Sequence, residues 1–247
     1  MTPETQTLRL AMWSGPRNIS TAMMRAWENR PDTAVWDEPF YAHYLAHTGI
    51  DHPGRDKIIA AGDSDWRSVV ARLTGPIPDG KTIFYQKHMT HHLLAHIDRS
   101  WLNSLSNCFL IRRPHEVLLS YSKTRDHVTA EDVGFPQQAE IFEYVRNHTH
   151  TTPIVIDAAD FLKQPRGFLE LICTRLDIPF SERMLNWPPG PRASDGVWAE
   201  YWYAAVQTST GFAPYRSRRE PLPPKLLKVA QACMPYYESL HRYRLAI

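Results

Sequence analysis

Short apolar runs recur along this 247-residue sequence, and longer amphipathic segments separate them. The runs are rich in β-branched and aromatic residues, as is typical of strands that are buried on both faces of a sheet. They cover Leu8–Trp13, Thr33–Asp37, Thr82–Gln86, Asn107–Ile111 and Pro153–Asp157. Helical spacers between such strands make neighbouring strands parallel. The pattern therefore predicts an α/β fold, with a central parallel sheet of about five strands and helices on both faces.

The amphipathic segments predict the helices. They cover Ile19–Asn29, Trp66–Leu73, His91–Ser100, Pro114–Arg125, Pro136–His150, Pro165–Leu176, Ala193–Gln207 and Pro223–Arg242. Proline opens four of these segments, where its missing N–H costs nothing. Pro235 should interrupt or kink the last helix. Ligands of open parallel sheets bind beyond the carboxyl ends of the strands, so the residues that follow each strand are the candidate site residues.

Length and composition favour one domain over residues 1–247. An apolar fraction of 43% and eight tryptophans are ample for a sizeable core. With a formal net charge of +2, the chain lacks the dense basic stripe that binding to duplex nucleic acid requires. Any basic patch should therefore suit a small polyanion. Cys108, Cys173 and Cys233 form no metal or disulfide pattern, which favours a reducing compartment. With no leader-like N-terminus and no long apolar run, we expect a cytoplasmic protein without a membrane partner.

The first strand ends at a short polar loop, and a helix-compatible segment follows at once. The loop reads Ser14-Gly15-Pro16-Arg17-Asn18. Its N–H groups and the positive end of the following helix would point at one spot and stabilise an anion there. Ser20 and Thr21 stand where hydroxyls cap a helix or donate to phosphate oxygens. The loop lacks the GxxxxGK[ST] and GxGxxG fingerprints, and an ordinary strand–turn–helix corner stays an alternative.

Two adjacent carboxylates, Asp37 and Glu38, end the second run, and Pro39 forces an extended exit. One of them would serve as a general base at the edge of the sheet. A salt-bridged pair at a strand end is the structural alternative. A second alternative is a carboxylate that organises Mg²⁺ for phosphoryl transfer.

Lys87 and His88 follow the third run and would neutralise charge on a leaving group. Histidines 88, 91, 92 and 96 raise the question of a metal, because two pairs have i,i+4 spacing. No HExxH motif or nearby carboxylate completes a ligand set, so we expect no metal here.

The fourth run leads into Arg112, and Pro114 opens a helix that carries Ser120 and Tyr121. The planar guanidinium of arginine suits bidentate capture of a phosphate. An ion pair of Arg112 at the sheet edge is the structural alternative.

Two strings together resemble the nucleotide-binding signatures of the P-loop sulfotransferases that use 3′-phosphoadenosine 5′-phosphosulfate (PAPS). Pro16-Arg17-Asn18-Ile19-Ser20-Thr21 is similar to the 5′-phosphosulfate loop, with Ile19 in place of the family's glycine. Arg112-Arg113-Pro114-His115-Glu116-Val117-Leu118-Leu119-Ser120-Tyr121 is similar to the 3′-phosphate signature. Both strings stand at strand-to-helix junctions in the family's order. The chain therefore resembles a bacterial sulfotransferase over roughly residues 8–180.

The resemblance implies a role for each matching residue. The 5′-phosphosulfate would be held by Arg17, Asn18, Ile19, Ser20 and Thr21, with Arg17 in place of the family's lysine. Arg112 and Ser120 would hold the 3′-phosphate, and Arg216 and Arg218 would cover it from the C-terminal segment. Glu38 would be the catalytic base, with Lys87 or His88 assisting. Arg17, Lys87 and the loop N–H groups would stabilise the charge that grows on the bridging oxygen.

Sulfuryl transfer from PAPS to a hydroxyl, or an amine, of a small molecule is the function that this resemblance implies, with no metal required. Residues 187–224 would form a lid in which aromatic side chains stack on adenine or wall the acceptor pocket. Core packing of Trp198 and Trp202 is the alternative for that segment.

Two rival functions stay open. One is a magnesium-dependent P-loop kinase with Asp37 or Asp157 on the metal, and the other is a nucleotide-binding domain without chemistry. The acceptor and the oligomeric state stay open, and no nucleic-acid partner is expected.

Overall fold

In the described part of the chain, a parallel sheet of five strands organises the fold, in the order β2-β3-β1-β4-β5. The computed structural model describes residues 7–121 and 128–247. The strands are β1 (Leu8–Ser14), β2 (Thr33–Asp37), β3 (Ile83–Met89), β4 (Ser106–Ile111) and β5 (Ile154–Asp157). This arrangement confirms the predicted α/β class. β3 runs further than the sequence predicts, so Lys87 and His88 lie inside the strand and not after it.

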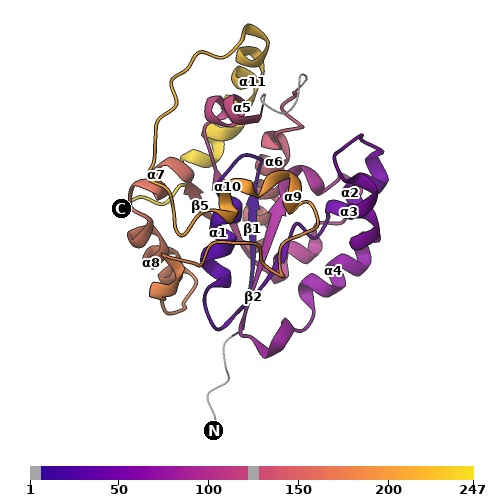
Figure 1. Ribbon diagram of the computed structural model, residues 1–247, viewed down its shortest axis with the longest axis vertical. Helices are drawn as coiled ribbons and strands as arrows, with labels where there is room; N and C mark the ends of the chain where they lie inside the picture. Colours follow the sequence, from indigo (N-terminus) through magenta and orange to yellow (C-terminus); the bar gives the residue numbers. More distant parts are fainter. Residues whose placement is uncertain (1–6, 122–127) are drawn as a thin grey trace.

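Helices surround the sheet (Figure 1). They are α1 (Ser20–Glu28), α2 (Tyr41–Thr48), α3 (Arg55–Ala61), α4 (Trp66–Thr74), α5 (Pro114–Tyr121), α6 (Phe135–Thr149), α7 (Ala158–Lys163), α8 (Pro165–Arg175), α9 (Ala199–Trp202), α10 (Ala204–Gln207) and α11 (Pro224–His241). Six predicted helices match α1, α4, α5, α6, α8 and α11, although the predicted end of α5 at Arg125 falls outside the described residues. Pro235 lies within α11 and does not end it. None of the described helices is both long and apolar enough to cross a bilayer.

The predicted helix His91–Ser100 is wrong. Two short 3-10 turns, Thr90–His92 and Ser100–Ser104, flank an irregular stretch instead. The guanidinium of Arg99 donates to the carbonyl oxygens of Leu94 at 2.8 Å and of Ile97, and so satisfies acceptors that a helix would have used.

The predicted helix Ala193–Gln207 is also wrong, because the chain there forms only the short helices α9 and α10, separated at Tyr203. Three other helices, α2, α3 and α7, were not expected. The last of them follows β5 directly, because the carboxylate of Asp157 accepts hydrogen bonds from the N–H groups of Ala159 and Asp160 and caps the helix.

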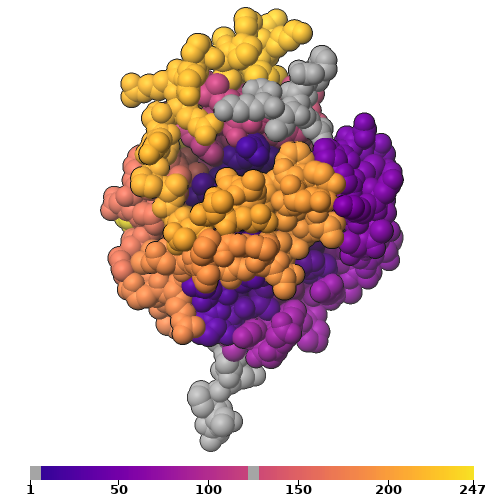
Figure 2. Space-filling view, in the orientation of Figure 1, coloured from indigo at the N-terminus to yellow at the C-terminus, as the bar shows by residue number. Residues whose placement is uncertain are grey.

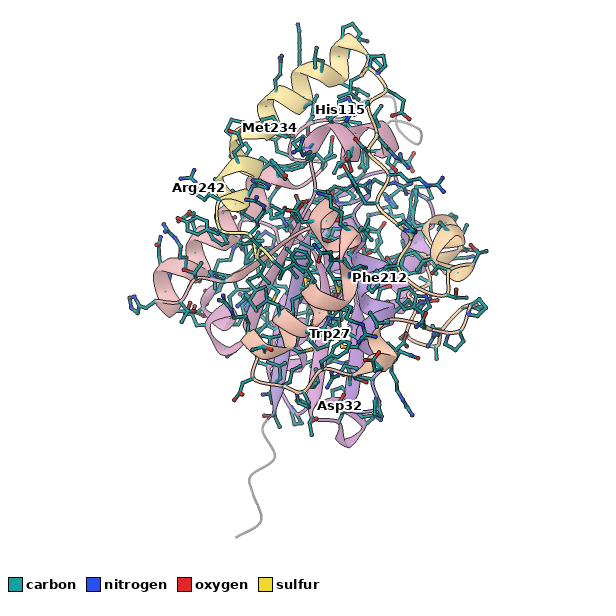
Figure 3. The ribbon with its side chains drawn as sticks, turned by 90° about the vertical axis from the view of Figure 1, so that its left-hand side faces the viewer. Trp27, Asp32, His115, Phe212, Met234 and Arg242 are labelled. Atoms are coloured by element: carbon teal, nitrogen blue, oxygen red, sulfur yellow. The ribbon has the colours of Figure 1, made fainter. Side chains whose placement is uncertain are left out.

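Strand alternation gives the sheet two apolar faces. Ala11, Trp13 and Phe109 pack with α4, α5, α6 and α11 on one face, whereas Leu10 and Met12 pack with α1, α7 and α8 on the other. Each fully buried large apolar side chain contributes about 1.5–3 kcal/mol to stability. In Figure 3, Met234 of α11 lies near His115 of α5, and Trp27 and Asp32 lie at the other end of the molecule.

A third apolar cluster fastens the segment 187–213 to the rest of the fold. Trp198 and Tyr203 of this segment pack against Tyr41 and Leu45 of α2. The buried guanidinium of Arg25 in α1 also pairs with Asp195 at 2.6 Å. Figure 2 shows the orange segment lying across one face of the molecule, with indigo residues of the N-terminal part visible on both sides of it.

Candidate active site

A cavity of about 400 Å³ lies at the carboxyl edge of the sheet. The chain that follows β1, β2, β3 and β4 lines it from the sheet side, and the segment 187–213 covers it. Its lining includes nine of the predicted site residues, namely Arg17, Asn18, Ile19, Ser20, Thr21, Glu38, Lys87, Arg112 and Ser120. His88, Arg216 and Arg218 are not in the lining.

The loop after β1 is locked in place by its neighbours. A Cβ on Gly15 would stand 2.5 Å from the carbonyl oxygen of Val133, so only glycine fits the turn. The side chain of Asn18 donates to the Leu110 carbonyl at 3.0 Å and accepts from the Ile19 N–H at 2.8 Å. Arg17 adopts a left-handed conformation with φ of 56°, which costs free energy for a non-glycine residue.

The N-terminus of α1 points its first N–H groups toward the cavity. Ile19 is the N-cap residue and makes no side-chain cap, and the first turn has no acidic residue. The N–H groups and the helix dipole are therefore available to an anion. Ser20 and Thr21 line the cavity at this point.

Three polar side chains meet at one end of the cavity. The Nε of Arg17 donates to the Oγ of Ser120 at 2.9 Å, and an Nη of Arg112 donates to the carbonyl oxygen of Arg17 at 3.0 Å. Glu116 accepts from Arg112 at 3.0 Å and orients it. Burial and the neighbouring charges of Arg218 and Arg112 lower the pKa of Arg17. This end of the cavity thus presents two guanidinium groups, a donor set that suits a phosphate, and Glu116 neutralises part of the charge of Arg112.

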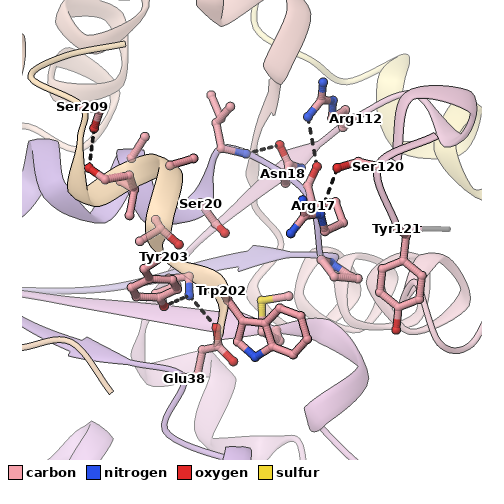
Figure 4. A pocket seen from close by; sticks show the side chains of 18 of the residues that line it. Arg17, Asn18, Ser20, Glu38, Arg112, Ser120, Tyr121, Trp202, Tyr203 and Ser209 are labelled. Atoms are coloured by element: carbon pink, nitrogen blue, oxygen red, sulfur yellow. Dashed lines mark hydrogen bonds and ion pairs between the residues drawn. The ribbon is translucent and has the colours of Figure 1, made fainter. Parts of the chain in front are cut away.

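A carboxylate and an ammonium group face each other at the other end of the cavity. The Nζ of Lys87 donates to Glu38 at 2.6 Å, to Asp37 at 2.8 Å and to the hydroxyl of Tyr203 at 2.8 Å. Lys87 and Asp37 are almost fully buried, and the side chain of Glu38 keeps 10% of its exposure. Ser20 lies between this group and the arginine end (Figure 4).

Burial raises the pKa of Glu38 from its ordinary 4.5 to about 7; Lys87 opposes this shift and Asp37 adds to it. For Lys87, burial acts against the charge, but Asp37 and Glu38 outweigh it and raise its pKa well above the ordinary value. Glu38 therefore changes its charge near neutral pH while Lys87 stays an ammonium. A carboxylate with such a pKa can accept a proton from a substrate.

Tyr203 lines the cavity, and no specific role was predicted for it. Its hydroxyl donates to Asp37 at 2.6 Å and accepts from Lys87, so it fixes the pair on which Glu38 depends. The aromatic cluster near Trp198 was the only signal for it. Of the two tryptophans in that cluster, Trp198 is buried against Tyr41, whereas Trp202 lines the cavity. Core packing therefore holds for Trp198, and Trp202 belongs to the cavity lining.

His88 does not reach the cavity. Adjacent residues of a strand point to opposite faces, and Lys87 takes the face toward the cavity. The ring of His88 stacks on Trp13 at 4.3 Å within the core, and burial lowers its pKa to about 3. The geometry gives no support to the expected assistance from His88. His92 lines the cavity instead, with its Nδ1 3.9 Å from Glu38.

The two aspartates proposed for a magnesium ion have other partners. Asp37 binds Lys87 and Tyr203, and Asp157 caps α7 and accepts from the hydroxyl of Tyr237 at 2.9 Å. Neither aspartate is among the residues that line the cavity.

Arg216 and Arg218 are exposed on the irregular segment before α11. The neighbouring Tyr215 donates to Glu116 at 2.7 Å, and Glu116 in turn holds Arg112. The charge of Arg218 also acts on Arg17. The segment therefore lies against the arginine end, although neither arginine lines the cavity.

Comparison with known proteins gives a match to the family described as "Sulfotransferase domain" over residues 8–244. Two curated proteins of Arabidopsis thaliana are also similar. Branched-chain-amino-acid aminotransferase-like protein 2 is 31% identical over 92% of this chain and 40% of its own length. Branched-chain-amino-acid aminotransferase-like protein 1 is 32% identical over 94% of this chain and 41% of its own. The chain thus spans about 40% of the length of these relatives.

Solved structures share the fold at low sequence identity. The sulfotransferase domain from the curacin biosynthetic pathway has 14% identity and a TM-score of 0.51, over 94% of this chain and 99% of that one. A sulfotransferase from Alicyclobacillus acidocaldarius has 11% identity and a TM-score of 0.54, over 96% and 97%. At these identities the likeness establishes the arrangement of elements and nothing about substrates.

Proposed function

Because this chain belongs to the sulfotransferase family, we propose that it transfers a sulfuryl group from PAPS to a hydroxyl, or an amine, of a small-molecule acceptor. The observation that carries the proposal is one cavity with an arginine end and a carboxylate end. The strand order places Glu38 after β2, Lys87 on β3, the anion loop after β1 and Arg112 after β4. At about 4.8 Å per strand, the sheet spaces Glu38 and Arg112 by roughly 14 Å, which suits an extended nucleotide.

The arginine end would hold the 3′-phosphate of PAPS. Arg112 and Ser120 supply the hydrogen bonds, and Arg218 adds positive potential. Arg17, which the resemblance assigns to the 5′-phosphosulfate, donates to Ser120 and therefore adds its charge at this end instead. The N–H groups at the start of α1 would hold the 5′-phosphosulfate, with the hydroxyls of Ser20 and Thr21 beside them. The residues present therefore fit the nucleotide.

PAPS supplies an activated sulfuryl group and leaves as 3′,5′-bisphosphoadenosine (PAP). Glu38 would remove the proton from the acceptor as its oxygen bonds to sulfur. Lys87 and the loop N–H groups would stabilise the negative charge that grows on the departing phosphate oxygen. Tyr203 and Asp37 hold the ammonium of Lys87 at the required place. Trp202, Tyr41 and His92 would line the acceptor side of the cavity.

Turnover of ³⁵S-labelled PAPS against a panel of alcohols, phenols and amines tests the proposal. We expect ³⁵S-labelled product with PAPS, and no ³²P-labelled product when γ-³²P-ATP and Mg²⁺ replace it. Phosphoryl transfer from ATP with no sulfate transfer would establish the kinase alternative. The third possibility is that the protein binds PAP, transfers sulfate to no acceptor class, and binds PAP equally well after Glu38→Gln. That result would identify a nucleotide-binding domain without chemistry.

A further inference from the structure

Three histidines gather away from the proposed donor site. His43 and His47 are one turn apart on α2, and His96 lies in the irregular stretch before the turn Ser100–Ser104. Their nitrogens lie within 4.8 Å of one another, and within the described part of the chain these three alone form such a group. His91 and His92, which line the cavity, are not part of it.

The hydrogen bonds of His43 fix which of its nitrogens faces the group. Its Nδ1 lies 2.7 Å from the carbonyl oxygen of Ser64, and because a carbonyl only accepts, this nitrogen carries the proton. The neutral ring then has its lone pair on Nε2, which lies 3.0 Å from Nε2 of His96. A histidine that ligates a metal is oriented by the same kind of contact to a backbone carbonyl.

The His43 and His96 nitrogens have the spacing of two ligands of one ion. Two imidazole nitrogens at 2.0–2.1 Å from a tetrahedral zinc ion are about 3.3 Å apart, close to the separation of the His43 and His96 nitrogens. The ring of His47 lies 4.2 Å from that of His96. A shared proton would bridge two nitrogens, whereas a metal ion engages all three.

We propose that His43, His47 and His96 form a binding site for a divalent transition metal ion of the zinc class. Imidazole ligands suit zinc, nickel, cobalt and copper, and select against magnesium and calcium. His43 is buried and the other two histidines are exposed, so the fourth ligand is water on the solvent side. The ion fastens α2, which supplies Tyr41 to the cavity, to the irregular stretch that follows the turn Thr90–His92.

The test titrates tag-free protein, stripped with chelator, with Co²⁺ and Zn²⁺. We expect one equivalent of Co²⁺ to give the intense visible bands of a tetrahedral site, and Zn²⁺ to displace it and raise the Tm. His47→Ala and His96→Ala should each weaken binding at least about 100-fold, since even the loss of an outer-shell partner costs 10- to 100-fold. His148→Ala on α6 is the matched control and should bind as the parent does.

The proposal would be overturned if Co²⁺ gave only the weak visible bands of an octahedral complex. It would also be overturned if His96→Ala left the affinity for Co²⁺ unchanged. Binding that is lost in His92→Ala and kept in His96→Ala would overturn it too, because the ion would then sit in the cavity. None of these readouts uses sulfate transfer, so their outcome is independent of the proposed function.

Discussion

At the scale of single residues, Glu38 combines two properties that rarely coexist. It is buried beside Asp37, which favours the protonated form, and it contacts the ammonium of Lys87 at 2.6 Å, which favours the carboxylate. Its φ of 43° is a further cost for a residue with a side chain. A buried residue with a shifted pKa and a strained backbone conformation is more often found in an active site than in a purely structural role.

Glu38→Gln should lower the rate of sulfate transfer about 10²- to 10⁴-fold, because a neutral amide takes up no proton. In the parent protein, kcat/KM should rise with pH and level off above a pKa of about 7, since Glu38 must be ionised to act. Rates measured from pH 5.5 to 8.5 check both expectations. Glu170→Gln on the exposed face of α8 is the control, and an acid limb that persists in Glu38→Gln would contradict the assignment.

The same pKa gives a prediction about stability. Because the folded state raises the pKa of Glu38 from 4.5 to about 7, its favourable contribution is complete below pH 4.5 and is lost as the pH rises through 7. Relative to Glu38→Gln, the parent protein should therefore lose unfolding free energy over this window, by an amount on the order of 3 kcal/mol. Urea unfolding of both proteins at pH 4.5 and pH 8 measures the difference. If the difference in unfolding free energy between the two proteins is the same at both pH values, the folded state does not shift the pKa of Glu38.

Arg112 and Arg113 are adjacent arginines with different surroundings, which makes them a matched pair. Arg112→Ala should weaken PAP binding about 10- to 100-fold, the cost of one or two charge-assisted hydrogen bonds. Arg113 is held by the hydroxyl of Tyr237 and lies outside the cavity lining, so Arg113→Ala should change binding less than about threefold. Calorimetry with PAP distinguishes the two. Equal losses would show that only net charge matters.

At the scale of elements, most of the fold and site features that the sequence predicts concern the strands and the strand-to-helix junctions. All five strands were found, because buried strands between amphipathic helices have a distinct apolar pattern. The junction residues follow from the rule that ligands bind beyond the carboxyl ends of strands. The sequence does not predict to which face of the sheet the side chains of Lys87 and His88 point, because this depends on where β3 ends. Tyr203 was missed because it meets Lys87 across 116 positions of sequence.

The loop between β1 and α1 also has a packing requirement. Gly15→Ala would place its Cβ 2.5 Å from the Val133 carbonyl, so the loop or the turn before α6 must shift. We expect a loss of about 1–3 kcal/mol in unfolding free energy, and weaker PAP binding because the N–H groups of the loop move. Pro16→Ala adds no such contact and should cost less than about 1 kcal/mol. Chemical denaturation and PAP calorimetry on both variants test this.

At the scale of the whole molecule, the cavity joins parts that are distant in the chain. The sheet supplies its floor, and the segment 187–213, anchored by Arg25 and Tyr203, supplies its cover. A ligand that contacts both should therefore stabilise the entire fold. At 100 times its Kd, PAP adds about 2.7 kcal/mol to the free energy of unfolding. For a chain of this size, that corresponds to a rise in Tm of roughly 5–10 °C.

Thermal unfolding with and without PAP measures this effect. Adenosine 5′-phosphate at the same concentration should give a much smaller shift, because it leaves the arginine end without a phosphate. Equal shifts for the two nucleotides would contradict the assignment of Arg112 and Ser120.

If Arg112 and the N–H groups at the start of α1 each hold an anion, the contact between Arg112 and the backbone of Arg17 couples the two positions. An anion that orders Arg112 also orders the peptide groups that precede α1, and this coupling is reciprocal. A nucleotide bearing charged groups at both positions should therefore bind more tightly than the affinities of its two halves imply. We therefore expect ATP, which would engage one half of this unit, to bind more weakly than PAPS.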